Sequence, residues 1–90
     1  MSKRERLEII KDILIIIQNN KNSIRITPLI RKSNLSSSRF KQYFNELLEK
    51  RFIKIIRNSK KEKIISLTDK GSNFLNKYKT IVNFIEEFEL

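Results

Sequence analysis

The chain has 90 residues, enough for one domain but too few to build a deep substrate pocket. It contains no Cys and no His, which excludes a disulfide framework, the common zinc, haem and iron–sulfur sites, and catalytic triads with a His base. Twenty basic and ten acidic residues give a net charge of +10, so we expect a polyanionic partner: nucleic acid, an anionic membrane surface or an acidic protein.

The first predicted element is a helix. Apolar residues spaced three and four apart indicate an amphipathic helix over residues 4–18. The apolar run at 13–17 would also suit a buried strand, but the length of the whole pattern favours a helix, and the run is too short to span a membrane. Residues 19–23 then have the composition of a loop, and residues 24–26 alternate like a short strand.

Two further helices are predicted in the middle of the chain. Thr27 as the N-cap and Pro28 as the first helical residue predict a short helix, which residues 33–34 end. Ser36 predicts the N-cap of a third helix that runs to about residue 50. The side chains expected to face inward from this helix are Phe40, Tyr43, Phe44, Leu47 and Leu48.

The remaining pattern is strand, strand, helix. Residues 52–57 and 63–67 have the composition of strands, and the polar loop between them predicts a β-hairpin. Thr68 predicts the N-cap of the last helix. The element order predicts a mainly helical α+β fold, a winged helix-turn-helix (helix, short strand, helix, helix, two-stranded wing) at 1–67, followed by a C-terminal helix at 68–90.

The positive charge is confined to the middle of the chain. Residues 21–63 carry thirteen basic and three acidic side chains. Residues 1–20 have a net charge of +1, and residues 64–90 a net charge of −1. The charge therefore coincides with the predicted helix-turn-helix and wing, which favours DNA as the partner.

The third helix is the predicted recognition helix. In a helix-turn-helix the second helix of the pair lies in the major groove, where Arg, Gln and Asn bind base edges and Ser and Lys bind bases or phosphates. The candidate contacts on this helix are Ser37, Ser38, Arg39, Lys41, Gln42 and Asn45. We expect Arg39 and Gln42 to bind bases and Lys41 to bind phosphate. The alternative is that these residues form an ordinary solvated face.

Basic residues in the hairpin predict a second DNA contact. A basic wing adds affinity by displacing counterions from the backbone or minor groove. The candidates are Arg57, Lys60, Lys61 and Lys63, with Arg31 and Lys32 near the end of the short helix flanking the same phosphates. The lysines would also serve simply to stop the hairpin from pairing edge to edge with another chain.

The last helix carries apolar residues in a two-heptad pattern typical of a coiled coil. The residues of this pattern are Phe74, Tyr78, Ile81, Ile85 and Phe88. They could pack on the first helix of the same chain. We favour a two-fold homodimer in which this helix packs antiparallel on its mate, because so long a helix exceeds what the small body can cover.

Two stretches resemble the small archaeal winged helix-turn-helix proteins of about this length. They are Asn34-Leu35-Ser36…Phe40…Tyr43-Phe44…Leu47…Phe52-Ile53 and Leu67-Thr68-Asp69-Lys70-Gly71…Phe74-Leu75…Tyr78, the second matching an LT-x-x-G-x-x-F-L pattern. The resemblance implies binding of double-stranded DNA and pairing through an antiparallel C-terminal coiled coil, in transcriptional regulators or chromatin-associated proteins. Arg51 departs from the pattern, since these proteins usually have Gly there to end the recognition helix.

Three functions remain open from the sequence. The protein could be a transcriptional regulator, an architectural chromatin protein with little sequence preference, or a winged-helix module that binds protein or RNA. An enzyme is not expected, because the basic segment has only three carboxylates, Glu46, Glu49 and Glu62. We expect no cofactor, no metal and no membrane partner, and a cytoplasmic, nucleoid-associated location.

Overall fold

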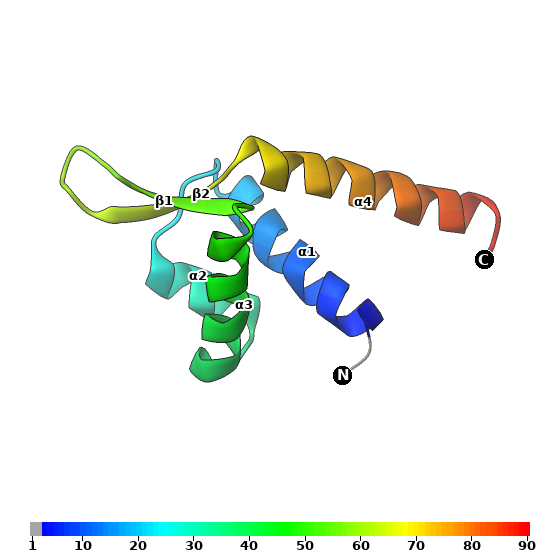
Figure 1. Cartoon of the computed structure of the whole chain (residues 1–90), viewed down its shortest axis with the longest axis horizontal. Helices are drawn as coiled ribbons and strands as arrows, with labels where there is room; N and C mark the ends of the chain where they lie inside the picture. Colours follow the sequence, from blue (N-terminus) through cyan, green and yellow to red (C-terminus); the bar gives the residue numbers. More distant parts are fainter. Residues whose placement is uncertain (1–2) are drawn as a thin grey trace.

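A computed structural model describes residues 3–90. Within them, the chain forms four helices and a two-stranded antiparallel sheet, whose hairpin projects beyond the helices (Figure 1). The elements are α1 (Lys3–Asn19), α2 (Ile26–Ser33), α3 (Ser37–Glu49), β1 (Ile53–Arg57), β2 (Lys63–Leu67) and α4 (Asp69–Glu87). This arrangement confirms the mainly helical winged helix-turn-helix with an additional C-terminal helix.

The start of α2 differs from the sequence prediction. The helix begins at Ile26, and its N-cap, Arg25, makes no side-chain capping bond. Thr27 and Pro28 therefore lie inside the first turn, where a Pro costs no hydrogen bond because the first four N–H groups of a helix have no partner there. The predicted strand at 24–26 shrinks to one bridge, in which Ile24 and Ile65 exchange backbone hydrogen bonds of 3.2 and 2.7 Å.

The turn between α2 and α3 is formed as predicted. Asn34 ends α2 in the left-handed conformation at φ 59°, and its N–H bonds to the Arg31 carbonyl. Ser36 caps α3, its hydroxyl accepting the Arg39 N–H at 3.2 Å. A turn of three residues thus joins the two helices, as in a helix-turn-helix.

The end of α3 uses a left-handed residue that is not glycine. Arg51 has φ 62°. Its N–H bonds to the Leu48 carbonyl at 3.1 Å, and the Phe52 N–H bonds to the Leu47 carbonyl at 2.9 Å. These two bonds make a Schellman motif, so the helix ends in the usual geometry, with Arg51 in a conformation that costs a non-glycine residue about 1 kcal/mol.

One hydrophobic core joins α1, α2, α3, the sheet and the beginning of α4. Its fully buried side chains are Phe40, Ile13, Leu14, Ile17, Leu29, Leu47, Ile65 and Leu75. The two strands contribute unequally to this core. In β2 the residues from Ile64 to Leu67 are buried, whereas in β1 only Ile53 is, so the outer part of the hairpin extends from the body as a wing (Figure 1).

Helix α4 lies against the body only near its beginning. Thr68 caps it by accepting the Gly71 N–H at 3.1 Å, as predicted. Gly71 and Leu75 are its only buried residues. Beyond them the helix runs away from the body, with α1 diverging beneath it (Figure 1). Its second half is therefore largely in solvent.

Candidate nucleic-acid interface

The outward face of α3 is polar and accessible. Phe40, Tyr43 and Leu47 attach the opposite face to the core. The exposed candidates on this helix are Ser37, Ser38, Lys41, Gln42 and Asn45. A helix presents such residues on one side because positions three and four apart share a face. The side chains are short at the beginning of the helix, so that end can approach another surface closely.

Arg39 lies at the flank of α3 and not at the centre of this face. Its guanidinium donates to the Glu5 carboxylate on α1 at 3.0 Å. This hydrogen bond raises the pKa of Arg39 above its ordinary value. A base contact by Arg39 would therefore require this ion pair to break or rearrange.

A second ion-pair cluster joins the same flank of α3 to α1. The Glu46 carboxylate pairs with Arg6 on α1 and accepts from Lys50 at 3.1 Å. The charges on the flank that faces α1 thus have internal partners, whereas Lys41 is exposed and has no acidic partner among the described residues. Positive charge is left available on the outward face.

The tip of the wing is ordered by its own polar groups. The Asn58 side-chain oxygen accepts the N–H groups of Lys60 at 2.9 Å and Glu62 at 3.0 Å. Arg57 donates to the Lys61 carbonyl at 2.8 Å, and Lys61 has φ 63°. All four basic candidates of the wing, Arg57, Lys60, Lys61 and Lys63, are exposed. The hairpin holds them in a defined turn.

The tip of the wing is also tied to the residue before α2. Glu62 accepts from Arg25 at 3.1 Å and from the Asn58 amide at 3.2 Å. Arg31 and Lys32 are exposed in the last turn of α2, where Lys32 donates to the Asn20 side chain at 3.4 Å. The basic candidates therefore lie on three neighbouring elements, α2, α3 and the wing.

The proposed heptad residues of α4 have two different environments. Phe74 is half-buried, and its ring meets the Phe52 ring edge-on at 5.3 Å, so it belongs to the core of its own chain. Tyr78 is also half-buried, with the Lys11 ammonium 5.9 Å from its ring. By contrast, Ile81, Ile85 and Phe88 are 59%, 40% and 57% exposed.

Phe84 joins these exposed side chains, since it is 55% exposed and its ring lies 4.9 Å from the Phe88 ring. We call Ile81, Phe84, Ile85 and Phe88 the α4 stripe, because spacings of three and four place them on one face. Leu90, at the end of the chain, and Leu7 on α1 extend the exposed apolar surface. A single chain covers these side chains only in part.

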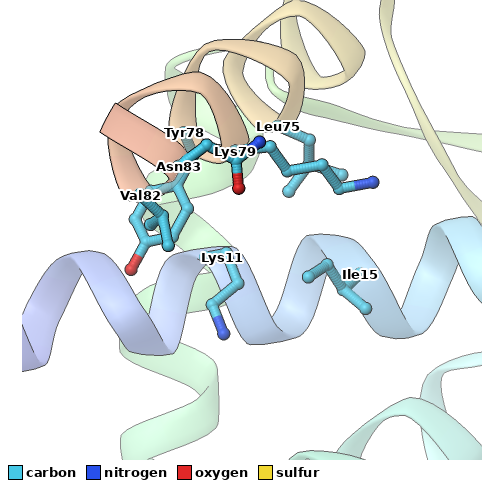
Figure 2. A pocket seen from close by; sticks show the side chains of 7 residues that line it. All are labelled: Lys11, Ile15, Leu75, Tyr78, Lys79, Val82 and Asn83. Atoms are coloured by element: carbon cyan, nitrogen blue, oxygen red, sulfur yellow. The ribbon is translucent and has the colours of Figure 1, made fainter. Parts of the chain in front are cut away.

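Two clefts separate α1 from α4. The inner one has a volume of about 270 Å³, and Figure 2 shows Tyr78 pointing from α4 toward α1, with Ile15 on α1 and Leu75 on α4 farther along the cleft. Beside it, the Lys11 ammonium donates to Asp12 at 2.6 Å, a bond that raises the pKa of Lys11. The outer cleft, about 690 Å³, opens between Leu7 on α1 and Ile81 and Ile85 on α4. Both have largely apolar walls.

Comparison with known proteins places this geometry in a family. A family model for the winged helix-turn-helix matches residues 3–86. The chain belongs to the winged helix-turn-helix family. No curated protein matches the chain.

Two solved structures share this winged-helix fold. Sso10a-2, described as a DNA-binding protein from Sulfolobus solfataricus, is 22% identical over 92% of this chain and 83% of its own, with a TM-score of 0.69. F-93 of SSV1 is 23% identical over 88% of this chain and 91% of its own, with a TM-score of 0.63. The resemblance to small archaeal winged-helix proteins is thereby confirmed at the level of fold.

Residues 3–90 also bear on two other kinds of site, a metal centre and a membrane span. No group of acidic side chains there is arranged to hold a metal ion. No helix there is long and apolar enough to cross a membrane.

Sequence reasoning missed two classes of residue. The first class consists of ion-pair partners that are far apart in the sequence: Glu5 pairs with Arg39, 34 positions away, and Arg25 pairs with Glu62, 37 positions away. No local signal marks these partners. Phe84 and Asn58 did carry a signal. Phe84 stands three residues after Ile81 and four before Phe88, and an Asn at the start of a polar loop is a frequent turn former.

Proposed function

We propose that this protein binds double-stranded DNA as a homodimer and acts as a transcriptional regulator. The observation that carries the proposal is the position of the charge. All of the +10 net charge arises in residues 21–63, the segment that supplies the outward face of α3 and the wing. Charge, recognition helix and wing coincide, as DNA binding by this fold requires.

We assign the contacts by chemistry and exposure. Gln42 projects from the exposed face of α3, and an amide there can bind adenine through two hydrogen bonds. Arg39 is the second base-binding candidate, available once it leaves Glu5. We assign the phosphate contacts to Lys41, Arg57, Lys60 and Lys61. The remaining candidates for DNA contact are Arg31, Lys32, Lys63, Ser37, Ser38 and Asn45. The name of Sso10a-2 as a DNA-binding protein supports the same partner.

The dimer part of the proposal rests on the α4 stripe. Four large apolar side chains on a projecting helix would remain in water in a monomer, at an unfavourable free energy of about 25 cal/mol per Å². A second copy of α4, packed antiparallel, covers the stripe symmetrically. The dimerisation residues are then Ile81, Phe84, Ile85 and Phe88, with Tyr78 at the edge, while Phe74 supports the helix from within its own chain.

An architectural role is the second candidate. Thirteen basic residues within residues 21–63 favour affinity that does not depend on base sequence. Such a protein would coat or bridge DNA using the wing and Lys41, with the amides of α3 contributing little. The two roles differ in how binding varies among sequences and not in whether duplex DNA is bound.

Fluorescence anisotropy on labelled DNA over a series of salt concentrations tests the proposal. Four phosphate contacts per protomer predict that log K falls with log salt at a slope of about −3.6 per protomer. Duplexes enriched from a random library should retain tighter binding than random duplexes at high salt if the protein is a regulator, and equal binding would favour the architectural role. Binding to single-stranded RNA but not to duplex DNA would overturn the proposal.

A further inference from the structure

The beginning of α4 is attached directly to the turn that ends the recognition helix. Thr68 donates its hydroxyl to the Arg51 carbonyl at 2.5 Å. Its backbone N–H donates to the Phe52 carbonyl at 3.1 Å. The residue that caps α4 is therefore bonded to both residues of the turn that follows α3.

Lys70, in the first turn of α4, reaches the last carbonyl of the recognition helix. Its ammonium donates to the Lys50 carbonyl at 2.9 Å and lies 4.9 Å from the centre of the Phe52 ring. A cation at the C-terminal end of a helix interacts favourably with the helix dipole and with carbonyls that have no partner in the helix. This bond joins the two helices end to end.

Gly71 lets the two segments approach this closely. It is the only glycine in the chain, and its φ is negative, so no left-handed conformation explains it. A Cβ atom here would overlap the Phe52 carbonyl oxygen and would lie 3.1 Å from the carbonyl carbon. That oxygen cannot easily move away, because the Thr68 N–H holds it. The missing side chain serves close approach.

We propose that this α3–α4 junction (Lys50, Arg51, Phe52, Thr68, Lys70 and Gly71) fixes the direction of α4 relative to the recognition helix and so sets the half-site spacing on DNA. The inference rests on the proposed dimeric, DNA-binding function. In such a dimer α4 is the only connection between the two recognition helices, so its angle at the junction determines their separation. The junction residues are positioning residues that need not touch DNA.

Helix α4 is long enough for a small change of angle at the junction to alter the half-site spacing. A helix of 19 residues is about 28 Å long, so a tilt of 10° at its beginning moves its far end by about 5 Å. One base pair of DNA rises 3.4 Å. A change of about 10° at the junction is therefore enough to shift the preferred spacing by more than one base pair.

The absence of cysteine from the chain makes the geometry directly measurable. Spin labels on Ser38→Cys and Asn76→Cys, both at exposed positions, report the distance between α3 and α4 within one chain when the labelled protein is diluted with unlabelled protein. We expect one narrow distance distribution for this pair. Three variants are compared: the double variant Thr68→Val/Lys70→Met, the single variant Gly71→Ala, and the control Lys77→Met. The control removes a charge from an exposed position of α4 outside the junction.

We expect the Thr68→Val/Lys70→Met variant to place about five-fold more molecules outside the main distance, since loss of a helix cap shifts local equilibria by that factor. Gly71→Ala should shift the main distance itself, and Lys77→Met should change nothing. If circular dichroism shows that Gly71→Ala is unfolded, the Thr68→Val/Lys70→Met variant still decides, because Lys70 is exposed and outside the core. Unchanged distributions in the folded junction variants overturn the proposal.

Selection from duplexes with a random segment of about 40 base pairs, four helical turns, tests the consequence on DNA. The wild type should select one spacing, and the junction variants a different or broader set. If a variant has an altered distance between α3 and α4 but selects the same half-site spacing as the wild type, the proposed link between the junction and the spacing is overturned. A separate Ser38→Cys sample without dilution reports the dimer. If the interchain signal is absent, or if the protein binds no duplex DNA, the proposed function is overturned and the claim about half-site spacing fails with it. The intrachain distance between α3 and α4 still decides whether the junction fixes the direction of α4.

Discussion

Helices α3 and α4 each bury one face and leave another in water, but the exposed faces differ in chemistry. The exposed face of α3 is polar and basic, with Ser38, Lys41 and Gln42, and such side chains are readily hydrated. That of α4 carries the four large apolar side chains of the stripe. The comparison distinguishes two proposed interfaces on one small chain: a charged partner would suit the exposed face of α3, and an apolar partner would suit that of α4. Changes on α4 should therefore alter both sedimentation and DNA binding, whereas changes on α3 should alter DNA binding alone.

The largest effect is expected from charges placed in the α4 stripe. Ile81→Glu with Phe88→Glu should convert the dimer to a monomer in sedimentation at micromolar concentration, because paired carboxylates cannot be buried there. Loss of the second binding module should weaken DNA binding by about 10²–10⁴-fold. The matched control is Asn76→Glu, which adds a charge on an exposed position of α4 outside the stripe. A wild type that sediments as a monomer refutes the comparison at once.

Removing the wing charges should have the next largest effect. Lys60→Ala with Lys61→Ala removes two phosphate contacts per protomer, which should weaken binding about 30-fold per protomer near physiological salt and flatten the salt slope by about 1.8. The loss should be equal on every duplex sequence. Lys77→Ala with Lys79→Ala removes the same charge from α4 and serves as the control. An equal loss in the control would mean that only net charge matters.

A smaller and sequence-dependent effect is expected on α3. Gln42→Ala should cost roughly ten-fold on preferred duplexes and almost nothing on random ones, because an amide–adenine pair discriminates by about 1–3 kcal/mol. Arg39→Ala should behave likewise if Arg39 leaves Glu5 to bind a base. Competition binding with selected and random duplexes measures both. If Arg39→Ala weakens all sequences alike or none, its role is the ion pair with α1.

The smallest effect concerns stability and should leave both interfaces unchanged. Arg51→Gly should raise the free energy of unfolding by about 1 kcal/mol, because glycine adopts the left-handed conformation without strain. Arg51→Ala, which removes the same charge but keeps a Cβ, is the control and should not stabilise. Chemical denaturation measures both. A loss of DNA affinity in both variants would instead identify Arg51 as a contact residue.

Local signals predicted most of the fold. Ser36 and Thr68 were recognisable as caps because each stands before an apolar pattern of helical period, and each makes the expected hydrogen bond. The start of α2 was wrong because Pro28 is tolerated anywhere in a first turn, so its position alone does not fix the N-cap. The short strand was overestimated because one bridge from Ile24 is enough to bring the chain alongside β2.

The candidate site was less accessible to sequence reasoning. The residue types on α3 and in the wing were evident from composition and periodicity. The predicted residues other than Arg39 are exposed, and their contact with DNA stays a prediction. The ion pair between Arg39 and Glu5 was not evident from the sequence, because the two residues are 34 positions apart and the approach of Glu5 depends on how α1 packs. Phe74 fits the heptad as well as Ile81 does, and only the proximity of Phe52 assigns it to the core.

The α4 stripe also has a consequence for dosage. In the proposed dimer the stripe is covered only when two chains meet, so the population of dimers at low concentration should rise with the square of the amount of protein. DNA occupancy should then respond steeply to expression level, without any small-molecule effector. A cell would switch such a protein on or off by changing its copy number, and a two-fold change in synthesis would produce a roughly four-fold change in bound sites.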